Sequence, residues 1–571
     1  STKNDDEKLK EFIGIFSYES LVINKDILKF QSISDNEQRE ITNEFYKLFH
    51  ETRLMLIKSF KEKDNVSEQE AIFYAQVFLE RLLFLFFALD NNLIPNSNLF
   101  AERILNQIKL KQFTESSQKI FSDISLLFLS LYKGSKFIGV DGFGGEFLKT
   151  EIPSKVYFLD LQPRTFFADC IMNSKLSKRL KLLPNHQKIW ESLGTDVSPL
   201  IRNFILMDSV DFKSELNVTI LGHILEQSLD DFNKEKNSGD KKRKIDGVYY
   251  TPSKLTDYIC RHTIIPYLSK NNNNDVNELI SEYSENLDEL EEKILKIRIV
   301  DPACGSGAFL INAAEILLEI TDEITKIKSQ SVSSASSSGL DPYLHVEELS
   351  KIIENNIFGV DVNRESVGIT KLSLFLLMAK PGHKLKDLSQ NIINGNSVIN
   401  DKNVDINAFS WEEKFPKIFD KGGFDIVIGN PPWQEVQPNI DDFFAPLLEM
   451  QHLLLQKRIS KKFRSLKAKT KDELIKQVCN NPQVEKAYHE NLKLHHLQKE
   501  FFINKNNYKY QVSQIRGKTV AGIGVNLYKI FLEKSHSILK NSGNLGILLP
   551  SGIYYEAGST RLRQLLLEEY N

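Results

Sequence analysis

The second half of the chain alternates short β-rich runs with helical patterns, and this alternation limits the possible folds more than any other feature. The β-rich runs span residues 297–301, 357–362, 424–428 and 545–549. Helical patterns over residues 308–320 and 366–379 separate them. A strand, a helix and a second strand form the βαβ unit, which builds a buried parallel sheet. From about Ile245 onward the sequence therefore predicts an α/β fold.

Residues 1–240 differ in character and are predicted to form a mainly α-helical domain. Their clearest helix covers residues 68–89, where Phe78, Leu82, Leu85 and Leu89 recur at helical spacing. A polar, charged stretch over residues 233–244 is typical of a linker. We therefore expect one domain over 1–240 and an α/β domain over 241–571, interrupted by a polar, mostly helical insertion over 434–520.

Composition excludes several classes of protein. The 571 residues are 41% hydrophobic and 26% charged, so the chain is neither a disordered tail nor a fibre. The four cysteines have no metal-ligand spacing, which argues against structural zinc and fits a reducing, cytoplasmic setting. The longest wholly apolar run, residues 82–89, is much shorter than the roughly 20 residues of a membrane span. A helical pattern without a stop signal near residue 571 suggests a piece of a longer protein.

A glycine-rich segment follows the first β-rich run and opens the next helix. It reads Asp301-Pro302-Ala303-Cys304-Gly305-Ser306-Gly307, with Phe309 two residues later. Glycines there let the backbone turn sharply and approach a ligand at the carboxyl end of the strand. A plain turn is an equal alternative on this segment alone. Cys304 has no obvious base beside it, so a packing role is favoured over a nucleophilic one.

The second strand ends in Asp361, followed by Val362. An acidic residue at this place commonly accepts hydrogen bonds from ribose hydroxyls. Its distance of 60 residues from Asp301 exceeds the usual spacing of about 20, and a Ser-rich segment between the strands accounts for the excess. The alternative is that Asp361 only caps the next helix.

The run over 424–428 leads into Gly429-Asn430-Pro431-Pro432-Trp433. Two prolines fix φ and remove two N–H donors, so the Pro431 carbonyl and the Asn430 amide oxygen could face one amino group. Trp433 supplies a flat surface for stacking. This combination suits the exocyclic amine of a flat base. The alternative is a rigid turn with a buried tryptophan.

Together these motifs resemble the amino-methylating DNA methyltransferases, in particular the gamma class of N6-adenine enzymes. Asp301 to Gly307 is similar to their S-adenosylmethionine motif, and Asn430 to Trp433 matches their Asn-Pro-Pro-aromatic motif. The segment over residues 247–252 resembles the part that closes over the cofactor, and the segment over 394–398 resembles the loop after the third strand. The resemblance covers roughly residues 245–571. It implies a Rossmann-like, S-adenosylmethionine-dependent methyltransferase domain.

The architecture around these motifs resembles the fused type IIG restriction–modification enzymes and related phage-defence methylases. This resemblance implies a prokaryotic cytoplasmic protein that acts on double-stranded DNA and transfers methyl groups to N6 of a flipped adenine. It also implies nuclease and target-recognition domains on the full-length chain, although we expect no complete nuclease within these residues.

The resemblance assigns roles to single residues. Asn430 and the Pro431 carbonyl would accept hydrogen bonds from the N6 amine, with Pro432 keeping the turn rigid and Trp433 stacking on the base. The residues that would hold the cofactor are Tyr250, Thr251, Pro252, Asp301, Pro302, Ala303, Cys304, Gly305, Ser306, Gly307, Phe309, Asp361, Val362 and Asn396. No metal ligand is expected.

A basic cluster lies in the insertion. Residues 457–471 carry eight cations and no acid, among them Lys457, Arg458, Lys461, Lys462 and Arg464. A solvated helix would have the same pattern. A DNA enzyme with a net charge of −3 must concentrate its positive surface, so we favour contacts with DNA phosphates.

Two other functions remain open at this point. An Asn-Pro-Pro motif also serves other planar amines and amides, so RNA or a protein glutamine could be the methyl acceptor. The chain could instead be a non-catalytic DNA-binding or assembly subunit whose cofactor pocket is regulatory.

Overall fold

The structure is a computed structural model in which two compact units are distinguished. It describes residues 26–63, 66–96, 99–100, 124–143, 148, 162–163, 196–197, 199–212, 216, most of 218–228, 251, 253–332, 342–379, 387–436, 443–444, 468–511, 514–515, 518–519 and 525–570. One unit comprises Ser1–Val140 with Thr150–Ile220, and the other comprises Asp141–Lys149 with Leu221–Asn571. The expected domain boundary at residue 240 stays a prediction, because residues 229–250 lie outside the described part.

The described part of the first unit is mainly helical. Its helices include α2 (Asp26–Lys63), α3 (Glu68–Asp90) and α10 (Pro199–Asp208), and the two-residue strands β1 (Gln162–Pro163) and β2 (Asp196–Val197) pair antiparallel. Helix α3 begins at a capping box, in which the Ser67 hydroxyl accepts from the Glu70 N–H and the Glu70 carboxylate accepts from the Ser67 N–H. The helix predicted over 68–89 is thus confirmed.

Helix α3 also has the length and apolar composition of a membrane span. Among the described helices it is the one that passes this test, over Glu70–Asp90, and 83% of its apolar window is buried inside the protein. Buried Phe78, Leu82 and Leu85 make it the core of its own unit.

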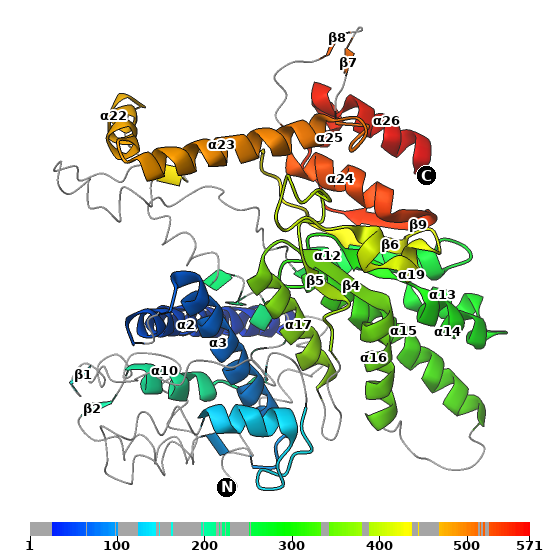
Figure 1. Ribbon diagram of the computed structural model, residues 1–571. Helices are drawn as coiled ribbons and strands as arrows, with labels where there is room; N and C mark the ends of the chain where they lie inside the picture. Colours follow the sequence, from blue (N-terminus) through cyan, green and yellow to red (C-terminus); the bar gives the residue numbers. More distant parts are fainter. Residues whose placement is uncertain are drawn as a thin grey trace. The chain divides into compact units, whose positions relative to one another are not determined.

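A five-stranded parallel sheet forms the centre of the second unit (Figure 1). Its strands are β3 (Ile299–Asp301), β4 (Ile357–Asp361), β5 (Ile392–Asn394), β6 (Phe424–Gly429) and β9 (Leu539–Ile547). They lie in the order β5-β4-β3-β6-β9, and all four pairings are parallel. From β3 the chain adds β4 and then β5 on one side of the sheet. It then returns and adds β6 on the other side of β3. The carboxyl ends of β3 and β6 therefore flank the switch point where ligands bind in open α/β sheets.

One face of the sheet is covered by aromatic side chains from a short helical segment. Helices α18 (Trp411–Lys414) and α19 (Pro416–Phe419) bring Trp411, Phe415 and Ile418 onto Val300 and Val427. Phe415 and Trp411 both pack on Phe424, with ring centroids 5.5 and 5.7 Å apart. Each such fully buried side chain contributes about 1.5–3 kcal/mol of hydrophobic stabilisation.

Longer helices contact the strands from the other face. They are α12 (Ser253–Leu268), α15 (Ala308–Val332), α16 (Pro342–Asn356) and α17 (Arg364–Met378). The close approach of α15 to β4 requires Gly359, because a Cβ at this position would lie 2.8 Å from Leu310 Cδ1. The helices predicted over 308–320 and 366–379 are confirmed, and α15 continues into the Ser-rich segment as far as Val332.

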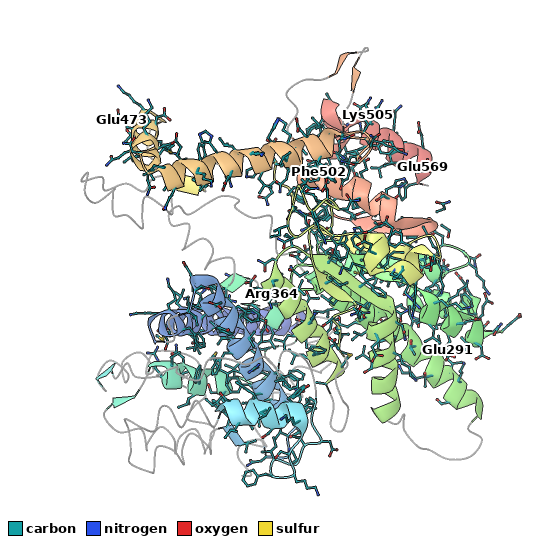
Figure 2. The ribbon with its side chains drawn as sticks, in the orientation of Figure 1. Glu291, Arg364, Glu473, Phe502, Lys505 and Glu569 are labelled. Atoms are coloured by element: carbon teal, nitrogen blue, oxygen red, sulfur yellow. The ribbon has the colours of Figure 1, made fainter. Side chains whose placement is uncertain are left out.

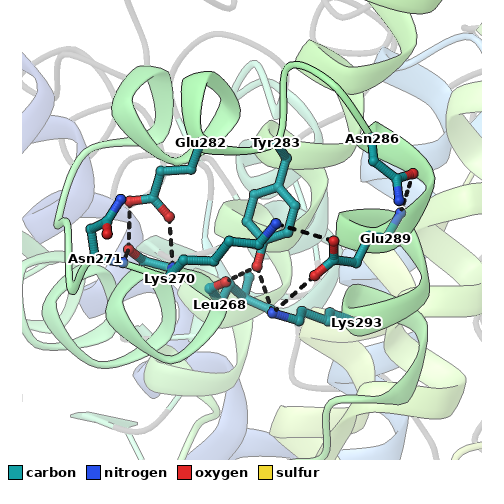
Figure 3. A network of polar contacts seen from close by, with 9 residues as sticks. Leu268, Lys270, Asn271, Glu282, Tyr283, Asn286, Glu289 and Lys293 are labelled. Atoms are coloured by element: carbon teal, nitrogen blue, oxygen red, sulfur yellow. Dashed lines mark hydrogen bonds and ion pairs between the residues drawn. The ribbon is translucent and has the colours of Figure 1, made fainter.

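A polar network joins the helices that precede β3 (Figure 3). Helices α13 (Val276–Glu282) and α14 (Leu287–Lys296) meet the end of α12 around the Tyr283 ring. The Tyr283 hydroxyl donates to the Leu268 carbonyl and accepts from Lys293, at 2.7 and 2.6 Å. Lys270 lies 4.0 Å from the ring centroid and also donates to Glu289, which lowers the pKa of that carboxyl. The network fixes the chain where it enters the sheet.

The described part of the insertion is an extended helical arm. Helix α22 (Ala468–Cys479) packs on α23 (Pro482–Ile503), and a short antiparallel pair, β7 (Gln514–Ile515) and β8 (Lys518–Thr519), follows. Figure 2 shows Phe502 at one end of the arm and Glu473 on α22 at the other. Phe502 is buried beside Tyr508, Val398 and Phe531, so the arm is anchored at its Phe502 end.

The last elements carry the fifth strand and the helices that follow it. Helix α24 (Leu527–Ile538) leads directly into β9, and α25 (Gly552–Tyr555), the 3-10 helix η3 (Ala557–Ser559) and α26 (Thr560–Glu569) come after it. The strand predicted over 545–549 begins earlier, at Leu539, because β6 also pairs with the polar residues that precede Leu545.

Candidate functional site at the switch point of the sheet

The glycine-rich segment after β3 is a tight turn held from two sides. Gly305 and Gly307 adopt positive φ values of 52° and 87°. Thr370 on α17 donates from Oγ1 to the Gly305 carbonyl at 2.7 Å. A Cβ at Gly307 would lie 2.8 Å from Thr370 Cγ2, so only glycine fits here. The turn thus brings bare backbone to the carboxyl end of β3, as the sequence predicted.

Cys304 is a packing residue within this turn. Its N–H donates to the Val360 carbonyl at 3.1 Å, and its side chain is buried. Burial, together with the carboxyls of Asp361 and Asp301, raises the pKa of the thiol well above its ordinary value. A thiol held protonated in this way is a poor nucleophile. The geometry therefore agrees with the packing role favoured from the sequence.

Asp361 ties the end of β4 to the glycine turn. One carboxylate oxygen accepts from the Gly305 N–H at 2.9 Å, and the other accepts from the Asn363 N–H at 2.8 Å. Helix α17 is capped by Asn363, whose side chain accepts from the Ser366 N–H at 3.0 Å. Asn363, and not Asp361, is therefore the N-cap of α17. Burial raises the pKa of Asp361 despite these two N–H donors.

Next to Asp361, the side chain of Val362 is 55% exposed. An exposed aliphatic residue beside a carboxylate offers an apolar surface next to hydrogen-bond acceptors. Asn396, in the loop after β5, is partly buried and bonded within its own loop. Its amide donates to Asp405 at 2.7 Å and its side-chain oxygen accepts from the Val398 N–H at 3.3 Å.

Asn430 stands at the end of β6 with its amide held in one orientation. Its Nδ2 donates to Thr251 Oγ1 at 3.0 Å, across 179 positions of sequence. Its Oδ1 is buried and accepts no hydrogen bond from the residues that the structure describes. A buried acceptor without a donor costs about 1–3 kcal/mol. Asn430 Oδ1 is therefore a candidate acceptor for an N–H group of a ligand.

The residues after Asn430 contact other elements through packing and one backbone hydrogen bond. Pro431 is buried, and Trp433 packs against a cluster that includes Tyr528, Leu532 and Ile553. Downstream, the Leu527 N–H donates to the Gln434 carbonyl at 2.8 Å.

Asp301 brings the two strand ends into contact. Its carboxyl is 1% exposed and accepts from the Ala303 N–H at 2.9 Å. A Cβ at Gly429 would lie 2.6 Å from Asp301 Oδ1, so the absence of a side chain at Gly429 lets the carboxyl approach β6. Burial and the neighbouring Asp361 raise the pKa of Asp301 to about 8. Strongly shifted carboxyls of this kind concentrate at functional sites.

Several residues that support the site could not be identified from the sequence. The Ser397 hydroxyl donates to the Pro302 carbonyl at 2.7 Å, and the Trp411 ring N–H donates to the Ser397 carbonyl at 2.8 Å. Phe309 and Ser306, which were predicted from the sequence, are both buried. Other predicted residues lie outside the described part of the chain: Tyr250, Pro252, Lys457, Arg458, Lys461, Lys462 and Arg464.

Comparison with known proteins identifies the domain that carries this site. Residues 355–476 match the family described as Eco57I restriction-modification methylase. The match supports a restriction–modification methylase domain in this part of the chain. The matched segment runs from the end of α16 through β4, β5 and β6 and includes the Asn430 motif.

Two curated relatives are named as both restriction enzyme and methyltransferase. The putative type II restriction enzyme and methyltransferase RM.MjaORFECS2P of Methanocaldococcus jannaschii is 28% identical over 398 residues, which cover 60% of this chain and 30% of the relative. The type II restriction enzyme and methyltransferase RM.Eco57I of Escherichia coli is 25% identical over 57% of this chain and 26% of its own length. The chain thus spans less than a third of either relative.

Among solved structures, the type IIL restriction-modification enzyme MmeI in complex with DNA is similar to this chain. The two are 18% identical with a TM-score of 0.42, over 71% of this chain and 45% of that one. The Rossmann-like α/β architecture of this chain is shown by its own parallel sheet and switch point.

Proposed function

We propose that the protein is a site-specific DNA methyltransferase that transfers a methyl group from S-adenosylmethionine to N6 of a flipped adenine. It would be the modification part of a prokaryotic, cytoplasmic restriction or phage-defence enzyme. The observation that carries this proposal is the buried Asn430 Oδ1, which accepts no hydrogen bond from the described residues around the switch point of the sheet. The N6 amine of adenine supplies the N–H group that this oxygen lacks.

The residues at the ends of β3 and β4 fit S-adenosylmethionine. The carboxylate oxygens of Asp361 each accept one backbone N–H and keep a further lone pair for ribose hydroxyls. Exposed Val362 would contact the adenine ring, and the bare backbone of Gly305 and Gly307 admits the methionine part. Asp301 would accept from its amino group. When bound, S-adenosylmethionine supplies an electrophilic sulfonium methyl group.

The protein's own part in the reaction would be to hold and polarise the target amine. Asn430 Oδ1 and the Pro431 carbonyl would each accept a hydrogen bond from one N–H group of the amine. These hydrogen bonds would localise the nitrogen lone pair for attack on the methyl group. Thr251 would keep the Asn430 amide in the orientation that presents Oδ1, because Thr251 Oγ1 accepts a hydrogen bond from Asn430 Nδ2. Trp433 would stack on the base. The chemistry needs no covalent bond to the protein, in agreement with the protonated Cys304 thiol.

Double-stranded DNA is the proposed partner. The cluster that includes Lys457, Arg458, Lys461, Lys462 and Arg464 would contact DNA phosphates. Nuclease and target-recognition domains would belong to the full-length chain, because the relatives are named as restriction enzymes as well as methyltransferases.

Methylation of RNA or of a protein glutamine is the second candidate function. Both substrates offer an amine or amide N–H group from which Asn430 Oδ1 could accept a hydrogen bond. A non-catalytic subunit with a regulatory cofactor pocket is the third. The oriented Asn430 oxygen, which has no donor among the described residues, supports binding of a substrate that brings an N–H group.

The test is transfer of tritiated methyl groups from S-adenosylmethionine to duplex DNA, followed by nucleoside analysis. We expect N6-methyladenine from the wild type and a loss of at least about a hundredfold in Asn430→Ala, the range found when one positioned hydrogen-bonding group is removed from an active site. The matched control is Asn403→Ala, in an exposed turn, which should retain activity. Unchanged transfer by Asn430→Ala would overturn the mechanism. Methylation of RNA or protein, but not of DNA, would favour the second candidate.

A further inference from the structure

Two adjacent tyrosines stand exposed beside the proposed catalytic loop. Tyr554 and Tyr555 in α25 are 79% and 74% exposed. Within the described part of the chain, neither ring stacks on another ring and neither hydroxyl has a hydrogen-bond partner. Large aromatic side chains are usually buried, so an exposed pair marks an interaction surface.

The pair lies at the same edge of the sheet as Asn430. The Leu548 N–H donates to the Gly429 carbonyl at 3.0 Å, one residue before Asn430. From Leu548 the chain reaches Tyr554 within six residues. Ile553, immediately before Tyr554, is buried in the cluster on which Trp433 packs. Two contacts thus connect the turn that carries the tyrosines to the loop that would hold the target base.

The turn that presents the tyrosines is braced on both sides. Arg563 donates to the carbonyls of Ile553 and Glu556 at 3.0 and 2.8 Å. The Glu556 carboxylate accepts from Tyr528 and from buried Lys529, at 3.0 and 2.7 Å. Because the backbone is fixed, little conformational entropy is lost when the rings bind a partner. Such preorganisation is typical of binding residues.

The charge of the segment favours a polyanion over another protein. Residues 548–563 contain one acid, Glu556, and it is paired with Lys529. Arg561 and Arg563, which donate to backbone carbonyls, exceed the one acid of the segment by a single positive charge. Exposed aromatic rings beside cations form the usual surface for unstacked nucleobases.

We infer that Tyr554 and Tyr555 stack on a nucleobase other than the target adenine, one that loses its stacking partner when the target leaves the helix. This inference rests on the proposed function, since it places the pair beside a flipped base. It adds a further contact surface for DNA, distinct from the Asn430 site and from the basic cluster.

The first test is kinetic and uses the full-length protein with phage DNA as the methyl acceptor. Stacking on an aromatic ring is worth roughly 5- to 150-fold in affinity per base. We therefore expect the double variant Tyr554→Ala/Tyr555→Ala to raise KM for DNA at least about fivefold, with little change in kcat and in KM for S-adenosylmethionine. The variant Tyr554→Phe/Tyr555→Phe keeps the rings and should keep the wild-type KM. Phe137→Ala, which removes a ring that is 86% exposed in the other unit, is the matched control and should change nothing.

The second test does not depend on turnover. Duplex DNA carrying 5-iododeoxyuridine in place of thymidine is bound and irradiated, and the crosslinked peptides are identified by mass spectrometry. A crosslink at Tyr554 or Tyr555 supports the inference even if the wild type transfers no methyl group, an outcome that would sink the proposed function alone. If the wild type methylates DNA while the alanine variant keeps its KM and the crosslinks map elsewhere, the inference is wrong. A change in self-association with an unchanged KM would make the pair a protein interface and would equally overturn it.

Discussion

Asn430 illustrates how one hydrogen bond prepares a side chain for chemistry. An amide has a donating and an accepting end, and in this site the donating end is taken by Thr251 Oγ1. The accepting oxygen then points away from Thr251, and it is buried with no described residue donating to it. In the proposed reaction, this energetic cost would be recovered when the target amine donates to the oxygen, as expected of a preorganised site.

Thr251→Val and Thr251→Ser test this orientation. Valine replaces the hydroxyl by a methyl group of similar size, so the Asn430 amide loses the contact that fixes it. We expect kcat to fall about tenfold or more, which corresponds to roughly 1.4 kcal/mol of barrier. Serine keeps the acceptor and should keep most of the activity. Methyl transfer at saturating substrates measures the effect, and equal kcat in the two variants would refute the role of the hydroxyl.

Asp301 predicts a pH dependence of stability. Its ordinary pKa is 3.8, and burial with Asp361 nearby raises the pKa to about 8 in the folded protein. Between these values the folded state binds the proton that the unfolded state releases. The stabilisation is complete below about pH 4 and is lost as the pH rises through 8, at about 1.4 kcal/mol per unit.

Asp301→Asn removes this ionisation and provides the measurement. Urea unfolding of both proteins between about pH 5.5 and 8.5 should show the wild type losing stability relative to the variant as the pH rises. Above about pH 8.5 the difference should level off. Parallel stability curves for the two proteins would mean that the pKa of Asp301 is not raised.

At the scale of elements, the strands in apolar surroundings were predictable because their signal is local. The runs at 297–301, 357–362 and 424–428 became β3, β4 and β6 within two residues. Strand β5, Ile392–Asn394, is too short to produce a periodic pattern and was placed only through the resemblance. The part of β9 before Leu545 contains Lys540, Asn541 and Asn544, so its pairing with β6 depends on tertiary context.

The site shows the same division between local and distant signals. The glycine turn and the Asn-Pro-Pro motif are contiguous in the chain, so the order of the residues alone was enough to recognise them. The contacts that hold them come from distant elements, as with Thr370 on Gly305 and Ser397 on Pro302. The exposure of Tyr554 and Tyr555 also had no signal, because it depends on which neighbouring residues pack.

Gly307, in the glycine turn after β3, and Gly422, which precedes β6, have nearly equal φ values, so comparing them distinguishes backbone strain from steric crowding. Gly307 and Gly422 have φ values of 87° and 92°. A Cβ at Gly307 would meet Thr370 Cγ2 at 2.8 Å, whereas a Cβ at Gly422 would lie 3.9 Å from Lys540 Cβ, an ordinary van der Waals contact. Gly422→Ala should cost about 1–2 kcal/mol from backbone strain alone. Gly307→Ala should cost clearly more.

Urea unfolding measures both effects, and Thr370→Ser provides a rescue. Serine lacks Cγ2 but keeps the hydroxyl that donates to Gly305, so it should recover part of the loss when combined with Gly307→Ala. Equal destabilisation by the two alanines, with no recovery, would show that the Thr370 contact does not restrict the turn.

For the whole molecule, the small net charge conceals an uneven distribution. The value of −3 sums 73 cations and 76 acids. Many described surface cations are paired with acids, for example Lys296 with Glu292 and Lys326 with Glu323. The eight cations of residues 457–471 have no acid among them. Average charge is therefore a poor guide to nucleic-acid binding in a chain of this length.

The basic cluster leads to a prediction about salt. If Lys457, Arg458, Lys461, Lys462 and Arg464 contact phosphates, replacing all five by glutamine should weaken DNA binding and flatten its salt dependence. The slope of log K against log salt is negative, and each lost phosphate contact reduces its magnitude by about 0.9. The five substitutions together should reduce the magnitude by up to about 4.5. Fluorescence anisotropy over a range of salt concentrations gives this slope. Glutamine at Lys296 and Lys326, which are already paired on α14 and α15, is the control and should leave the slope unchanged. An unchanged slope in the fivefold variant would make the cluster a solvated surface and would place the DNA-binding charge elsewhere on the chain.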